Sequence, residues 1–262
     1  MLKTRIIPCL DVVKNKVVKG VNFKNIKVMG NAVEMAKFYS EAGADELCML
    51  DINASYQNRK TFIKTVESIA KVINIPLTVG GGVSDLSDIT NLLNAGADKV
   101  SINSAAVKNP NLVKKASLVH GSQCIVVAID AKRLHGTFRV VIKGGRELTP
   151  KKLVDWALYV QKIGAGEILL TSMDTDGVQK GFDAEMLRSI TSKLTIPVIA
   201  SGGVGKLEHF YKGHQTRSTG LLAASVFHSG KYTIKQVKRF LDKKGVPVRL
   251  WAMITKIYLQ KF

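Results

Sequence analysis

Short apolar runs alternate with segments of helical periodicity along the whole chain. The runs are rich in Val, Ile and Leu and lack a clean polar alternation, which is typical of strands buried on both faces of a parallel sheet. Between two of them, Leu86, Ile89 and Leu93 recur at helical spacing. The predicted strands span residues 5–11, 46–52, 76–81, 99–103, 124–130, 167–172, 197–203 and 221–227.

Eight strands joined by helical crossovers predict an α/β fold. A single closed (β/α)8 TIM barrel is favoured over a doubly wound open sheet, because eight such units fill about this length of chain. The 262 residues show no internal linker. We therefore expect one barrel domain over residues 1–249, followed by an apolar and basic extension at 250–262.

An internal repeat supports a closed barrel. The stretch LTVGGGV at 77–83 returns as VIASGGV at 198–204, and each copy follows an Ile-Pro pair. Two further pairs of segments are similar: IIPCLD to IVVAID, and AGADELCMLDI to IGAGEILLTSM. The three pairs are separated by 119 to 121 residues. Similarity at a fixed offset indicates a duplicated structural unit. The sequence thus predicts two similar half-barrels.

The balance of charge is strongly basic, with 39 Lys and Arg against 20 Asp and Glu, a net charge of +19. Such an excess permits nucleic acid, an anionic membrane or a phosphorylated small molecule as partner. The charge is spread along the chain, with no arginine-rich arm and no basic run interleaved with aromatic residues. We favour a lysine-rich surface and expect no nucleic-acid partner.

The lack of a recognisable signal peptide and the positions of the cysteines indicate a reducing compartment. The N-terminal residues lack the apolar core and cleavage site of a signal peptide, and no run approaches the roughly 18 apolar residues of a membrane span. The three cysteines each lie in an apolar run, which is typical of reduced core thiols. We expect a cytoplasmic protein without a membrane partner.

Two aspartates end predicted strands one and five, which lie opposite each other in an eight-stranded barrel. Functional groups of such barrels gather at the carboxyl ends of the strands, so Asp11 and Asp130 would face each other across the mouth. Two opposed carboxylates can form an acid/base pair, with one protonated and one ionised. The alternative is that each merely caps the following segment.

The repeated glycines predict two anion sites. Backbone N–H groups of a glycine-rich turn can approach a phosphate closely. Gly82 would lie beside Asn103 and Ser104, and Gly203 beside Ser225, on opposite sides of the mouth. One substrate with two phosphates would occupy both, although glycine also ends strands for purely steric reasons.

Two other features of the sequence bear on metal binding. The DTDG stretch, which contains Asp176 and Gly177, lacks the later ligands of a calcium loop and fits a polar active-site loop better. The histidines show no metal-ligand spacing. We expect neither a metal nor another cofactor.

Four charged residues stand at the opposite ends of the strands. Because unpaired buried charge is costly, charges that point into the barrel must pair with one another. A structural salt-bridge plug and a gate at the bottom of a channel both fit this spacing. The four residues are Arg5, Glu46, Lys99 and Glu167.

The chain resembles the cyclase subunit of imidazole glycerol phosphate synthase, of histidine biosynthesis. The matching stretches include RIIPCLDV, VVKGVNF, GADKVSIN, GSQCIVVAIDAK and IPVIASGGVGKLEHF, and they cover residues 2 to about 249. The resemblance implies that ammonia from a separate glutaminase subunit, bound at the N-terminal face as a heterodimer, reacts with a bis-phosphorylated ribulosyl substrate. The products would be imidazole glycerol phosphate and an aminoimidazole carboxamide ribotide.

The resemblance also implies roles for the residues above. Asp11 and Asp130 become the acid/base pair, the four charges become an ammonia gate, and Lys19 lies in a loop that closes over substrate. The remaining residues expected to bind substrate or its phosphates are Gly82, Asn103, Ser104, Thr171, Asp176, Gly177, Ser201, Gly203 and Ser225.

Two segments depart from the family pattern, and they leave alternatives open. Residues 211–220, YKGHQTRSTG, replace a segment that in the family is a helix followed by an acidic approach to strand eight. Gly213 and its polar neighbours predict a weakened helix and altered packing beside Ser225. The extension at 250–262 passes the usual end of the family. The alternatives are the sister isomerase of the same pathway, a basic nucleic-acid-binding protein without catalysis, and a structurally compromised cyclase. The cyclase is favoured, because an isomerase needs no gate for ammonia.

Overall fold

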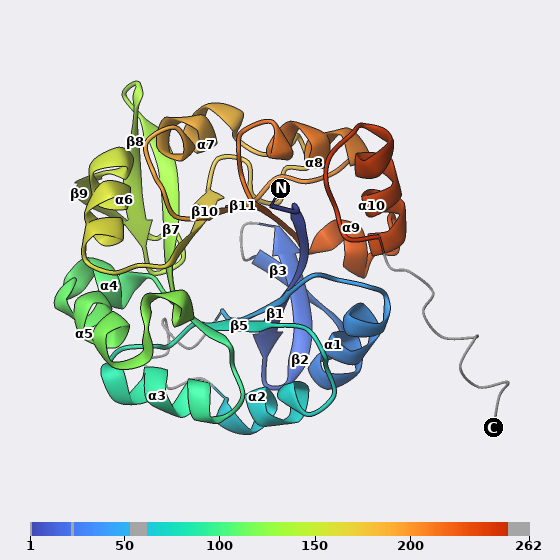
Figure 1. The fold of residues 1–262 in the computed structure, drawn as a ribbon, viewed down its shortest axis with the longest axis horizontal. Helices are drawn as coiled ribbons and strands as arrows, with labels where there is room; N and C mark the ends of the chain where they lie inside the picture. The colour runs from blue at the N-terminus through green and yellow to red at the C-terminus, as the bar shows by residue number, and fades with distance from the viewer. Residues whose placement is uncertain (1, 22–23, 53–61, 251–262) are drawn as a thin grey trace, which may run out of the picture.

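The computed structural model describes residues 2–21, 24–52 and 62–250, with the backbone alone at 19–21 and 24–27. Eight parallel strands form a closed ring in the order β10-β11-β12-β1-β4-β5-β6-β7, and β7 pairs with β10 to complete it (Figure 1). This confirms the predicted barrel. Its strands are β1 (Arg5–Val13), β4 (Leu47–Asp51), β5 (Leu77–Gly80), β6 (Lys99–Ile102), β7 (Ile125–Leu134), β10 (Glu167–Ser172), β11 (Val198–Ser201) and β12 (Gly220–Ala223).

The two halves contain the same elements in the same order. In each half, the first strand is followed by an antiparallel hairpin, β2 (Lys16–Val21) with β3 (Lys24–Asn31), and β8 (Thr137–Ile142) with β9 (Glu147–Lys152). Helices surround the barrel (Figure 1). They are α1 (Ala32–Glu41), α2 (Ile63–Ala70), α3 (Leu86–Asn94), α4 (Ser104–Lys108) and α5 (Asn111–His120), then α6 (Leu153–Lys162), α7 (Ala184–Thr191), α8 (Leu207–His214), α9 (Ser225–His228) and α10 (Ile234–Lys243).

The core has two layers. The larger layer lies between the strands and the helices, where amphipathic helices bury one face. The smaller one fills the barrel interior, and its seven members are at most 5% exposed. They are Ile7, Cys9, Cys48, Val126, Leu169, Ile199 and Leu222. Within the described ranges, no helix is both long and apolar enough to cross a bilayer.

Three local predictions need correction. Both hairpins were missed, and Lys19 lies in strand β2, where its backbone pairs with Lys27, instead of in a loop. The last barrel strand ends at Ala223, because the chain turns there into the short helix α9. The extension beyond residue 250 lies outside the described residues.

In the segment 211–220, where a weakened helix is predicted, the first residues are helical. Helix α8 continues to His214, and Gly213 lies buried inside it. A Cβ at Gly213 would come within 2.7 Å of Phe182 and 2.9 Å of Leu221. The glycine therefore permits close packing of α8 against the barrel, which offsets its low helix propensity.

Candidate active site

Strand alternation aims every second side chain of β1 into the barrel. Arg5 lies at the N-terminal opening, Ile7 and Cys9 lie in the interior layer, and Asp11 reaches the cavity at the carboxyl end. β7 places Val126 and Asp130 in the same way. The barrel thus has a charged layer at the N-terminal ends of the strands, an apolar layer in the middle and a polar layer at the carboxyl ends.

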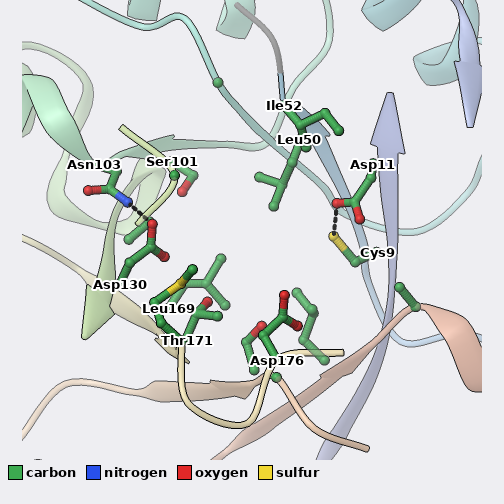
Figure 2. Close-up of a pocket in the computed structure, with 18 of the residues that line it drawn as sticks. Cys9, Asp11, Leu50, Ile52, Ser101, Asn103, Asp130, Leu169, Thr171 and Asp176 are labelled. Carbon is green, nitrogen blue, oxygen red and sulfur yellow. Dashed lines mark hydrogen bonds between the residues drawn. The ribbon is translucent and has the colours of Figure 1, made fainter. Parts of the chain in front are cut away.

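The cavity at the carboxyl ends of the strands holds the two predicted catalytic aspartates. β1 and β7 lie four strands apart in the ring of eight, and Figure 2 shows Asp11 and Asp130 on opposite sides of the cavity. The other predicted substrate-binding residues with described side chains all line this cavity. They are Gly82, Asn103, Ser104, Thr171, Asp176, Gly177, Ser201, Gly203 and Ser225.

Asp130 has an environment that favours its protonated form. Its pKa is raised to about 6, mainly by burial; a hydrogen bond from Asn103 opposes the rise, and the nearby charge of Asp176 adds to it. Asn103 Nδ2 donates to Asp130 Oδ2 at 2.9 Å. A carboxyl group with this pKa can exchange a proton near neutral pH.

Asp11 is held by its own strand and by the helices behind it. It is 8% exposed, and the Cys9 thiol donates to its Oδ1 over 3.8 Å (Figure 2). His228 Nε2 donates to the Cys9 carbonyl at 2.9 Å, so its Nδ1 accepts from the hydroxyl of Tyr39 at 2.7 Å. This chain of hydrogen bonds fixes strand β1 against α1 and α9. Burial raises the pKa of Tyr39, so the hydroxyl keeps its proton.

The repeated glycine turns adopt matching conformations. Gly81 and Gly82 have φ of 92° and 72°, and Gly202 and Gly203 have φ of 90° and 96°, all in the region that favours glycine. A Cβ at Gly81 would lie 2.2 Å from the Asp51 carbonyl oxygen. Glycine is therefore required for steric reasons at Gly81, and the phosphate contacts of these turns stay a prediction.

Sequence reasoning missed several residues that line the cavity. Cys9 was interpreted as a core thiol, although it lines the cavity and contacts Asp11. Arg146 reaches the rim from the turn between β8 and β9, and the backbone N–H of Lys143 in that turn donates to Ser104 Oγ at 3.0 Å. Two glycines at 144–145 between apolar alternating runs were the available signal for this hairpin.

A closed ring of ion pairs spans the N-terminal opening. Arg5 contacts Glu46 at 2.7 Å and also Glu167, while Lys99 contacts the same two carboxylates at 3.0 and 2.8 Å. Thr78 Oγ1 donates to Glu46 at 2.6 Å. All four predicted gate residues therefore meet, and each acid contacts both bases.

The ring sets the charge of its members. Burial disfavours the charged forms of Arg5 and Glu167. The hydrogen bonds and opposite charges within the ring outweigh this effect of burial for both residues. The pKa of Arg5 is accordingly raised and that of Glu167 lowered from their ordinary values, so both are ionised at neutral pH.

Comparison with known proteins identifies the family. Residues 5–233 match the family model described as histidine biosynthesis protein. A protein named imidazole glycerol phosphate synthase subunit HisF from Campylobacter concisus is 54% identical over 246 residues, covering 94% of this chain and 98% of the relative.

Two further relatives carry the same name. The protein of Gluconacetobacter diazotrophicus is 53% identical over 250 residues, covering 95% of this chain and 97% of the relative. The protein of Endomicrobium trichonymphae is 54% identical over 250 residues, covering 95% and 96%. The chain therefore belongs to the histidine biosynthesis protein family, among the HisF subunits of imidazole glycerol phosphate synthase.

Proposed function

We propose that the chain closes the imidazole ring in histidine biosynthesis. Ammonia from a glutaminase subunit reacts with the bis-phosphorylated ribulosyl formimino aminoimidazole carboxamide ribotide, giving imidazole glycerol phosphate and aminoimidazole carboxamide ribotide. The family and the names of the relatives support a cyclase subunit. The observation that carries the finer proposal is a pair of opposed aspartates between two matching glycine turns in one cavity.

The aspartates would move the protons of the reaction. Asp130, with a pKa of about 6, can hold a proton near neutral pH and donate it to a leaving oxygen. Asp11, on the opposite strand, would accept a proton as nitrogen attacks. A positioned acid or base of this kind contributes roughly 10²–10⁴-fold to the rate.

The glycine turns would hold the two phosphates. Gly82 lies with Ser104 on one side of the cavity, and Gly203 lies with Ser225 on the other. Gripping both ends stretches the substrate across the mouth and places its reacting centre between the carboxylates. Orientation of this kind lowers the entropic part of the barrier.

The barrel interior would carry ammonia from the ring of charges to the cavity. The seven interior residues that separate them are uncharged and apolar. Neutral ammonia can cross such a layer, whereas an ammonium ion would lose its hydration without a counter-ion. The charged ring closes the lower end, so it must open to admit ammonia.

The N-terminal face offers a surface for the glutaminase subunit. Helices run antiparallel to the strands, so the last turns of α1 and α5 lie at this face. They expose Phe38, Leu118 and Val119 by 61%, 77% and 61%. Exposed apolar side chains at one end of the molecule fit a protein partner.

Substrate turnover with an ammonium salt tests the proposal. Purified wild type should consume the bis-phosphorylated substrate in proportion to free ammonia, and Asp11→Asn should lose about 10²-fold or more of that rate. The variant should keep its thermal unfolding temperature. A folded wild type without turnover would contradict the proposal. If that protein instead converts the substrate of the sister isomerase, isomerase activity would replace cyclase activity as the proposed function.

A further inference from the structure

A basic groove lies on the N-terminal side of the molecule, at the ends of three helices. Arg188 comes from the last turn of α7, Arg217 follows α8 and Lys244 follows α10. His214 and Gln215 add polar side chains. None of its residues lines the catalytic cavity, which opens at the other ends of the strands.

The cations of the groove are not neutralised within the described part of the chain. No carboxylate lines the groove, and neither arginine nor Lys244 forms an ion pair with a described residue. Arg133 and Lys143, which are also surface cations, pair with Glu185 and Glu147 at 2.7 Å. Three exposed cationic residues thus line one groove.

Arg217 is held in place by the turn that presents it. Its neighbours Thr216 and Ser218 are 1% and 2% exposed. Thr216 Oγ1 donates to the Gly213 carbonyl at 2.6 Å, and Thr191 Oγ1 donates to the Thr216 carbonyl at 2.6 Å. Arg217 itself has φ of 64°, a left-handed conformation that persists only where the surroundings enforce it. The guanidinium is therefore presented from a fixed backbone.

The rest of the groove leaves room for a ligand. A Cβ added at Gly245 would meet nothing within 4 Å. His214 Nδ1 is hydrogen-bonded to Thr4 Oγ1 at 2.9 Å, and burial lowers its pKa, so the imidazole is neutral and offers its other nitrogen for hydrogen bonding.

We propose that this groove binds the phosphate group of a small molecule. Two guanidinium forks and one ammonium match the three terminal oxygens of a phosphate monoester, whereas a carboxylate has only two oxygens to offer. Four of the eight lining residues come from the segment 211–220. The site is separate from the two glycine turns at the catalytic cavity.

A titration followed by amide NMR locates the binding. Inorganic phosphate is added to the full-length chain at constant ionic strength, and the amides of residues 214–217 and 244–246 are followed beside those of the glycine turns. Groove amides should shift and saturate in wild type. The double variant Arg188→Gln/Arg217→Asn should bind phosphate at the groove at least about tenfold more weakly than wild type, because charge-assisted hydrogen bonds are lost. Asn is chosen because it tolerates the left-handed conformation.

A matched control removes two charges elsewhere. Lys114→Gln/Lys115→Gln, on the exposed face of α5, should leave the groove shifts unchanged. Groove amides that do not respond, or that respond equally in the Arg double variant, would overturn the proposal. An equal response to sodium acetate would overturn phosphate as the ligand. The single variant Arg188→Gln, at an exposed helical position, gives the same test without altering the turn.

Discussion

Asn103 donates a hydrogen bond to Asp130 at 2.9 Å, so the residue that follows the neighbouring strand β6 moderates the acidity of a proposed catalytic group. The bond stabilises the ionised carboxylate and opposes the rise in pKa that burial causes. Asn103 Oδ1 is buried without a partner among the described residues. The amide is thus held at its nitrogen by Asp130, while its oxygen is buried.

Replacing Asn103 by Ala should raise the pKa of Asp130 above its value of about 6, because the bond that favours the ionised form is lost. The limb of the pH–rate profile that reports Asp130 should therefore move to higher pH. Measuring kcat/KM from pH 5 to 9 checks this, with Ser101→Ala as a control for a change at the cavity wall. An unchanged or lowered apparent pKa would contradict the assignment.

Asp130→Asn should stabilise the protein at pH 8. The folded pKa of about 6 exceeds the ordinary 3.8, so ionised Asp130 costs stability that accrues as pH rises from about 4 to 6. The two units correspond to about 3 kcal/mol at most. Urea unfolding of both proteins should show the gain at pH 8 and its disappearance near pH 4. A gain that persists at pH 4 would point to a packing effect.

Glu167→Gln should destabilise the protein at neutral pH, because it leaves Arg5 and Lys99 to share one carboxylate. Breaking a buried ion pair from one side costs about 3–5 kcal/mol, and the partial exposure of the two bases reduces this. The pKa of Glu167 is lowered in the folded protein. Its ionised carboxylate therefore stabilises the fold fully at pH values above the ordinary pKa of a glutamate, and this stabilisation is lost as the pH falls through the lowered pKa. Unfolding at pH 7 and pH 4 should therefore show a smaller difference at the lower pH.

Gly81→Ala should cost more stability than Gly136→Ala, although both glycines have positive φ, of 92° and 76°. A Cβ at Gly136 meets nothing within 4 Å, so only the backbone conformation is penalised, by about 1 kcal/mol. At Gly81 the Cβ would also collide with the Asp51 carbonyl. Equal losses in thermal unfolding temperature would show that the close approach is relieved cheaply.

The barrel and most of the cavity could be predicted from the sequence, because buried parallel strands have a distinct composition and their carboxyl ends meet at one face. The pairing of Asp11 and Asp130 across the mouth follows from strand order alone. The hydrogen bonds of Cys9 and His228 could not be predicted in this way, because they depend on side-chain directions between residues 219 positions apart.

At Gly213, local helix propensity and tertiary packing have opposite effects. A glycine inside a polar segment predicts a poor helix, yet its missing side chain admits Phe182 and Leu221. Only the tertiary packing of α8 reveals this. The hairpins could not be predicted for a different reason. The (β/α)8 pattern contains one strand and one helix in each unit, so extra strands are not expected from it.

The hairpins also bear on the history of the chain. β2–β3 and β8–β9 follow the first strand of each half at the same point and precede α1 and α6. Two separate insertions would have had to occur at equivalent positions. A simpler course is that the ancestral half-barrel already carried its hairpin when its gene was copied and fused, and that the paired aspartates and glycine turns descend from one set.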